Sequence, residues 1–257
     1  MFIDHTGAVF PEHFGLGFRV VGRLAFPIFV FLLAEGFRHT RNPYNFLARL
    51  GVFAIVSEPF FDLALHTTLH GHETFSFRFL LDNVNFLSST NIFYTLFFGG
   101  VAIMAYRYII SQKDAIFNMR ETAKYPSGRV GIFGKTSVAI LFLVASFAFA
   151  ELLTTDYASY GVLFILLMYA VKTKKTRLAV MAFMCLWQHT NILAFIFDGY
   201  GAYLPFMFLL MIPATVFTVF LVMFYNGKRG PGGMKMLFYV LYPAHLGVLF
   251  AIAMWWS

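Results

Sequence analysis

Charged side chains are scarce in this chain of 257 residues: only 12% are Asp, Glu, Lys or Arg, whereas 60% are hydrophobic. A soluble globular domain carries about a quarter charged residues, so this composition excludes an ordinary water-soluble fold. The net charge of +7 does not indicate nucleic-acid binding, because the basic residues lie in short loops between apolar runs. The composition predicts a polytopic membrane protein.

Cysteine and recognisable cofactor motifs are also nearly absent. The single cysteine, Cys185, excludes an internal disulfide framework and a thiolate metal cluster. The chain contains neither a P-loop nor a dinucleotide-binding fingerprint. The histidines in HTTLHGH (66–72) are spaced by four and then two residues, which fits no standard metal motif, so we interpret the connection 66–89 as a solvated loop and expect no metal.

Long apolar runs dominate what is present. They predict an all-α, polytopic transmembrane helix bundle that forms a single domain over residues 1–257 with about nine membrane segments, at 1–10, 20–37, 46–65, 90–111, 137–153, 158–171, 178–197, 202–225 and 236–256. The first run is too short for a crossing of about 20 residues. Either it is a half-span, or Met1 is an internal methionine and the segment is truncated; we favour truncation.

Lysine and arginine are distributed unevenly between the two sets of turns. The turns 38–45, 112–136, 172–177 and 226–235, with the adjacent helix ends, hold all of them except Arg19, Arg23 and Arg78. The positive-inside rule places the basic turns in the cytoplasm. We therefore expect a multi-pass protein of the inner (cytoplasmic) membrane, with Met1 cytoplasmic and Ser257 outside if there are nine spans.

The stretch Gly22–Asn42, GRLAFPIFVFLLAEGFRHTRN, organises the predicted bundle. It is an apolar span with Arg23 just inside its start and Glu35 near its end. Ionisable groups are costly in hydrocarbon, so these side chains should face the protein interior or a water-filled cavity.

Two basic turns are candidates for binding the phosphates of a nucleotide-like donor. One directly follows Glu35, and the other is NGKRGPGG (226–233), whose glycines allow close approach of the backbone. Arginines that only set topology are the alternative explanation. The candidate residues are Arg38, His39, Arg41, Lys228 and Arg229.

Asp4 and His5 are the first candidates for chemistry. A histidine inside a membrane protein can act as a general base because it titrates near neutrality. Adjacent helical residues point about 100° apart, so Asp4 is not expected to orient the imidazole and another helix should supply its partner. The alternative is a polar residue that is hydrogen-bonded in a bundle core.

Glu58 and Asp62 are four residues apart in SEPFFDLAL and share one helix face. Two neighbouring carboxylates favour protonation of one of them, so the pair could handle a proton or clamp an arginine, with Arg23 as the expected counter-charge. A structural ion pair between two helices is the alternative. Asn91, in NIFYTL, is a further polar candidate.

Seven blocks in order along nearly the whole chain resemble the TraX family: IDHTGAVFPE, GRLAFPIFVFLLAEGFRHTRN, RLGVFAIVSEPFFDLAL, NIFYTL, DYASYGVLF, NGKRG and KMLFYVLYPAHLGVL. The family's named member N-acetylates the amino terminus of a conjugative pilin subunit with acetyl-CoA. The resemblance implies an integral membrane acyltransferase in which His5 is the base, and Asp4, Arg23 or Asn91 fixes geometry or stabilises an oxyanion.

The expected donor substrate is therefore acetyl-CoA, and the acceptor is an amine or hydroxyl of a pilin-like peptide, glycan or lipid. No serine or cysteine lies in a nucleophile setting, so direct transfer is expected rather than a covalent intermediate. A proton-coupled transporter and a non-catalytic assembly partner are the competing interpretations. The absence of an inverted repeat disfavours the transporter.

Overall fold

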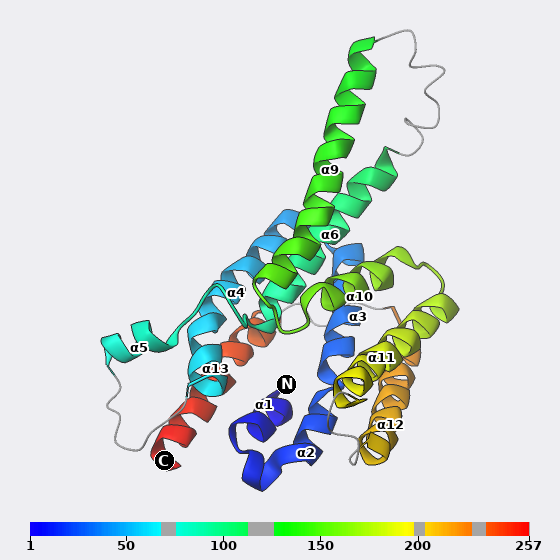
Figure 1. Cartoon of the computed structure of the whole chain (residues 1–257). Coiled ribbons are helices and arrows are strands. Elements are labelled where there is room, and N and C mark those ends of the chain that lie inside the picture. Colours follow the sequence, from blue (N-terminus) through cyan, green and yellow to red (C-terminus); the bar gives the residue numbers. More distant parts are fainter. Residues whose placement is uncertain (68–75, 113–125, 198–203, 228–234, 257) are drawn as a thin grey trace.

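The computed structural model describes residues 1–67, 76–112, 126–197, 204–227 and 235–256, and every regular element in these ranges is a helix (Figure 1). In chain order the helices are α1 (Phe2–Val9), α2 (Pro11–Gly22), α3 (Ala25–His39), α4 (Pro43–Leu65), α5 (Phe77–Asn83), α6 (Ile92–Ser111), α9 (Pro126–Leu152), α10 (Ala158–Ala170), α11 (Lys174–Phe197), α12 (Leu204–Met223) and α13 (Lys235–Trp256). The all-α prediction is confirmed.

Four helical stretches in the described ranges are long and apolar enough to cross a membrane, namely Gly17–His39, Ile92–Ser111, Phe133–Leu152 and Met236–Trp256. Two shorter apolar helices lie at Ala158–Ala170 and Ile212–Met223. Each predicted apolar run contains a helix, so the positions were predicted well. The count of about nine crossings is not confirmed by this structure.

The helices define two ends of the bundle. At one end, here called the basic end, α3 and α10 finish near the start of α11, where Arg38 and Arg177 both reach Glu35. Toward the other end, here called the opposite end, α6 begins beside the second half of α4, where Asn91 contacts Ala54 and Glu58. Helix α13 starts near the middle of α4, where Tyr239 contacts Phe53, and runs parallel to it toward the opposite end.

Residues 1–10 form a helix of eight residues, α1, and not a full crossing. At about 1.5 Å per residue it is about 12 Å long, against about 30 Å of hydrocarbon. Pro11 starts α2, and the non-helical backbone of Gly15 kinks it, so the chain turns back on itself. Helix α1 packs against α2, α4 and α13, and this placement carries His5 into the interior (Figure 1).

Close packing of α1 against α2 depends on Gly22. A Cβ atom at Gly22 would lie 2.1 Å from the Cβ of Asp4 and 2.6 Å from its Cα, and the backbone of α1 cannot yield as a flexible side chain can. The missing side chain therefore fixes the depth at which α1 lies in the bundle.

Replacing this glycine should destabilise the fold. We expect Gly22→Ala to lower the free energy of unfolding by about 1–3 kcal/mol through overpacking, seen as a lower Tm in detergent. Gly17→Ala in the same helix is the matched control, because a Cβ there meets nothing within 4 Å. Equal Tm values for the two variants would show that the α1–α2 contact does not limit stability.

Candidate functional site

The imidazoles of His5 in α1 and His245 in α13 form a pair that joins residues 240 positions apart. Nδ1 of His5 lies 2.8 Å from Nε2 of His245. The rings are parallel within 3°, with centroids 5.0 Å apart. Parallel rings stacked face to face cannot bring two nitrogens this close, so the rings meet edge to edge in nearly one plane, which is hydrogen-bond geometry. As predicted, a different helix supplies the partner of His5.

His5 is 3% exposed and lies among aromatic side chains. Phe61 and Tyr242 meet its ring edge to face, at centroid distances of 6.4 and 5.8 Å. Within the described part of the chain, only Nδ1 of His5 makes a hydrogen bond, and Nε2 makes none. The structure thus presents one ring nitrogen of His5 that is fixed and one that is available.

Tyr242 connects this pair to the carboxylates. Its ring also contacts His245, at 5.4 Å, and Phe93, at 5.1 Å. Its hydroxyl is buried beside the backbone N–H of Ile92, and it interacts electrostatically with Asp156 and Glu58. Its O–H finds no acceptor among the described residues. A buried O–H without an acceptor is costly, so this is a place where a water or a substrate group can bind.

Glu58 is fully buried and is held by Asn91, which caps the start of α6. The backbone N–H of Asn91 donates to Glu58 Oε2 at 3.1 Å, and its Nδ2 donates both to the same oxygen and to the carbonyl of Ala54. Its Oδ1 accepts from the N–H of Phe93. The amide of Asn91 is thus fully used in positioning Glu58, whereas Glu58 Oε1 remains buried without a partner.

Asp62, one turn beyond Glu58, is also buried and has separate partners. His66 Nδ1 lies 3.1 Å from Oδ1, and the backbone N–H of Asn85 donates to Oδ2 at 2.6 Å. The prediction that Glu58 and Asp62 share a buried face is confirmed. Hydrogen bonding to Asp62 raises the pKa of His66 above its ordinary value.

The predicted pairing of Arg23 with Glu58 and Asp62 is wrong. Arg23 lies at the α2–α3 junction and interacts with Asp4, Asp156 and Tyr157, donating a hydrogen bond to the Tyr157 side chain. Among the described residues, the carboxylates of α4 accept hydrogen bonds from Asn91, Asn85 and His66 and not from an arginine. Asp4 pairs with Arg19 at 3.2 Å, and its Oδ1 has no partner.

Asp156 occupies the turn between α9 and α10. Withdrawal from bulk water raises the pKa of this carboxyl to about 6, although Arg23 beside it favours the charged form. The side chain is nevertheless exposed to solvent, and Arg23 beside it is half-buried. A carboxyl whose pKa is raised toward neutrality beside an arginine is a candidate for a functional site.

At the basic end, one of the predicted phosphate ligands, Arg38, is already occupied by contacts within the protein. Arg38 donates to Glu35 through Nη1 and, through Nη2, to the carbonyls of Met168 and Tyr169 at 2.6 and 2.7 Å and of Val171 at 2.9 Å. Its guanidinium therefore caps the C-terminal end of α10. Arg177 also reaches Glu35, at 3.0 Å.

The remaining phosphate candidates differ in availability. His39 lies 3.4 Å from Glu35 and is half exposed, and Arg41 is exposed with no ion pair among the described residues. Lys228 and Arg229 lie outside the described residues. Of the predicted phosphate ligands, Arg41 and His39 are thus the described ones that can still meet an anion.

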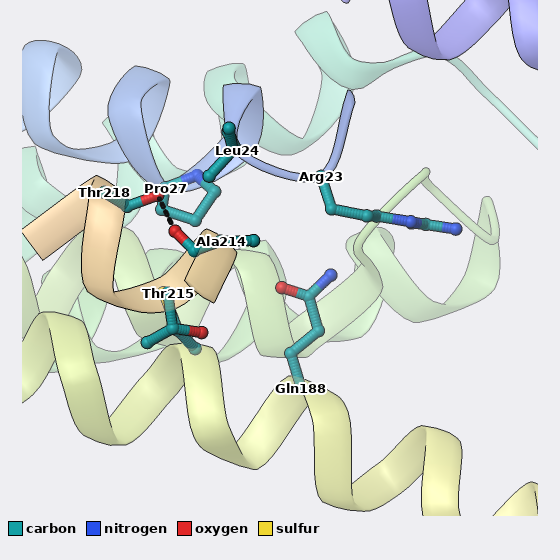
Figure 2. A pocket seen from close by; sticks show the side chains of 8 residues that line it. Arg23, Leu24, Pro27, Gln188, Ala214, Thr215 and Thr218 are labelled. Carbon is teal, nitrogen blue, oxygen red and sulfur yellow. Dashed lines mark hydrogen bonds between the residues drawn. The ribbon is translucent and has the colours of Figure 1, made fainter. Parts of the chain in front are cut away.

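A small pocket lies between α3, α11 and α12 and contains about 220 Å³ of empty space, part of it open to the surroundings. Figure 2 shows Arg23 and Gln188 at one end and Thr218, whose hydroxyl donates to the Ala214 carbonyl, at the other. The guanidinium of Arg23 interacts with Asp156 and Tyr157, so this residue lies between the pocket and the turn that joins α9 to α10.

Several residues of the site were not in the predicted set. His245, Tyr242 and Asp156 lie far from α1 in the sequence, and only tertiary contacts assign them to the site. The sequence did carry one signal for the first two, because the block YPAHLG places Tyr242 and His245 three residues apart on one helix face.

These features define a helical membrane protein with a histidine pair, of which His5 is buried and His245 half-buried, and a hydrogen-bonded carboxylate cluster near one end of the bundle. The TraX family profile, described as TraX protein, matches residues 1–253, so the chain belongs to the TraX family. It is 26% identical over 257 residues to the "Probable fimbrial assembly protein FimC, serogroup H1" of Dichelobacter nodosus, covering 97% of this chain and 89% of that protein. No solved structure matches the chain.

Removing the amide of Asn91 should leave the Glu58 carboxylate buried without donors. We expect Asn91→Ala to lower the free energy of unfolding by roughly 1–3 kcal/mol or more. Glu58→Gln should destabilise the protein less than Asn91→Ala, because a neutral Gln side chain needs fewer hydrogen-bond donors than a carboxylate when it is buried. A double-mutant cycle should show coupling within about 0.5–3 kcal/mol. Additive effects would contradict a direct interaction.

The contact between His66 and Asp62 should make stability depend on pH. The folded state raises the pKa of His66, so the stabilisation is fully present below the unfolded pKa and is lost as pH rises through the folded value. His66→Gln should therefore lower the Tm more at about pH 5.5 than at about pH 8.5. His13→Gln, an exposed histidine on α2, is the control. A larger effect of His66→Gln at the higher pH would contradict this assignment.

Proposed function

We propose that this TraX-family protein is a membrane acyltransferase that moves an acetyl or other acyl group from acetyl-CoA to an amine or hydroxyl, with His5 as general base. The observation that carries the proposal is the state of His5. It is buried, its Nδ1 is fixed by His245, and its Nε2 is available. A base must present a lone pair at a fixed position to remove a proton from the attacking group.

The surrounding groups fit the rest of this reaction. The acceptor would lose a proton to Nε2 of His5 while its nitrogen or oxygen attacks the thioester carbonyl, and CoA would leave as the thiol. The unpartnered oxygens of Asp4 and Glu58 offer hydrogen-bond acceptors, and the Tyr242 hydroxyl offers a donor, to hold and orient the acceptor substrate. Asn91 keeps Glu58 in place.

The donor would enter from the basic end. Arg41 and His39 would meet its phosphates, with Lys228 and Arg229 as further candidates from the sequence. Phe61, which contacts the His5 ring, lies 18 residues after Pro43, the first residue of α4, which corresponds to about 27 Å of helix. The extended pantetheine arm would have to cover a similar distance between the helices to bring the thioester to His5.

The acceptor we propose is a fimbrial or pilin subunit. The similarity to a relative whose name describes fimbrial assembly supports a role with such subunits, and the family resemblance points in the same direction. An assembly partner without chemistry is the second candidate, favoured by the same name. In that case, replacing His5 would change stability or assembly but no transfer reaction.

The proposed activity predicts a specific loss in one variant. Purified protein with acetyl-CoA and a peptide bearing a free amino terminus should release free CoA and form acetylated peptide. His5→Ala should slow both about 10²–10⁴-fold, the usual contribution of a general base. His13→Ala, an exposed histidine on the neighbouring helix, should leave both rates unchanged.

Three results would count against the proposal. Equal transfer by the wild type and His5→Ala at matched Tm would remove His5 from the mechanism. Absence of CoA release with any acceptor, together with normal fimbrial assembly, would favour the assembly partner. Release of CoA without acetylated product would indicate a thioesterase instead.

A further inference from the structure

The hydrogen bond of His245 to its own helix determines which of its nitrogens carries the proton. Nδ1 of His245 lies 2.8 Å from the carbonyl oxygen of Leu241, one turn earlier. A carbonyl oxygen can only accept, so Nδ1 of His245 must be the protonated nitrogen. In the neutral imidazole, Nε2 of His245 is then a hydrogen-bond acceptor.

The same reasoning fixes the tautomer of His5. Among the described residues, the donor that faces the lone pair on Nε2 of His245, at 2.8 Å, is Nδ1 of His5, so this nitrogen carries the proton. Nε2 of His5 is left as the unprotonated nitrogen. Leu241, His245 and His5 thus form a directional chain of hydrogen bonds that ends in a lone pair on the side of the ring away from His245.

We propose that His245 is a positioning residue, which holds His5 in the tautomer and orientation that a base at Nε2 requires. This inference rests on the proposed acyl transfer for its catalytic consequence, but its structural content stands alone. When Nε2 of His5 accepts a proton, the bond from Nδ1 to His245 becomes charge-assisted and therefore stronger. His245 would thus stabilise the imidazolium that forms as the acceptor is deprotonated.

Packing around the pair supports this role. Phe2 and Tyr242 meet the His245 ring edge to face, at 5.9 and 5.4 Å, and Tyr242 also meets His5. Aromatic edges on both rings restrict their rotation. A base held in one rotamer by a second residue and by packing loses little entropy when the acceptor arrives.

Two amide variants of His245 differ only in reach and separate positioning from packing. The amide of His245→Gln can place an oxygen near the position of Nε2 and accept from His5. The amide of His245→Asn is one methylene shorter and ends near the position of Nδ1, so it can meet Leu241 but cannot reach His5. We expect the Gln variant to keep kcat within about 3-fold and the Asn variant to lose about 10- to 100-fold, with the KM for acetyl-CoA unchanged in both.

The tautomers of His5 and His245 can be measured directly, without an activity assay. In protein labelled with ¹⁵N-histidine, we expect His5 and His245 each to show a protonated Nδ1 and an unprotonated Nε2, with signals assigned by comparison with His5→Ala and His245→Asn. In His245→Asn, His5 should lose its preference for this tautomer. Detection of His5 protonated at Nε2 in the wild type would overturn the proposal.

The two readouts separate this inference from the proposed function. If the wild type transfers no acyl group, the proposed function fails, and the ¹⁵N spectra still decide whether His245 sets the tautomer of His5. If transfer is found, equal losses of kcat in the Gln and Asn variants would show that only the imidazole's packing matters and would overturn the positioning role. Full activity in both variants would overturn it too.

Discussion

The bundle depends on a constraint that hydrocarbon imposes on polar groups, which must find their partners inside the protein. Near the opposite end of the bundle, this constraint connects four helices. His5 of α1 meets His245 of α13, and Glu58 of α4 meets the cap of α6 at Asn91. Each bond joins segments that are distant in sequence. The same bonds that satisfy buried groups therefore also assemble the candidate site.

Some of these buried polar groups have no hydrogen-bond partner. Asp4 Oδ1, Glu58 Oε1 and the Ser57 hydroxyl are buried without partners among the described residues, and the Tyr242 O–H finds no acceptor there. Most buried polar atoms in a folded protein are hydrogen-bonded, so these exceptions need an explanation. A substrate that brings hydrogen-bond donors would provide one. At the basic end, by contrast, the N–H groups of Arg38 donate to Glu35 and to the carbonyls at the end of α10.

Much of the fold was predictable from the sequence, because apolar runs and turn residues are local signals. The helices follow the runs, and Asn42 and Pro43 begin α4 as a capping residue and a first-turn proline do in general. The first run was recognised as too short for a crossing, with a half-span as the less favoured alternative. The depth of α1 and the kink at Gly15 were not predicted, because they depend on tertiary contacts such as that of Asp4 with Gly22. The number of membrane crossings depends on the membrane as well as on the chain, so the pattern of apolar residues alone does not determine it.

The candidate site was predictable as a list of residues and not as a set of pairs. His5, Glu58 and Asp62 were recognised because ionisable groups in apolar helices are unusual. Their partners were not predicted, because the sequence shows which residues share a helix face but does not show which helix packs against that face. Arg23 shows the consequence: its depth suggested Glu58, whereas the structure places it with Asp156 and Tyr157.

The most direct test of the central claim is a structure of the protein with a non-transferable acetyl-CoA analogue. The account predicts that the acyl carbonyl lies close enough to Nε2 of His5 for an acceptor nitrogen to fit between them, with the phosphates at the basic end near Arg41. An analogue whose acyl group stops at the basic end, or lies on the far side of α13 from His5, would contradict the assignment of His5 as the base.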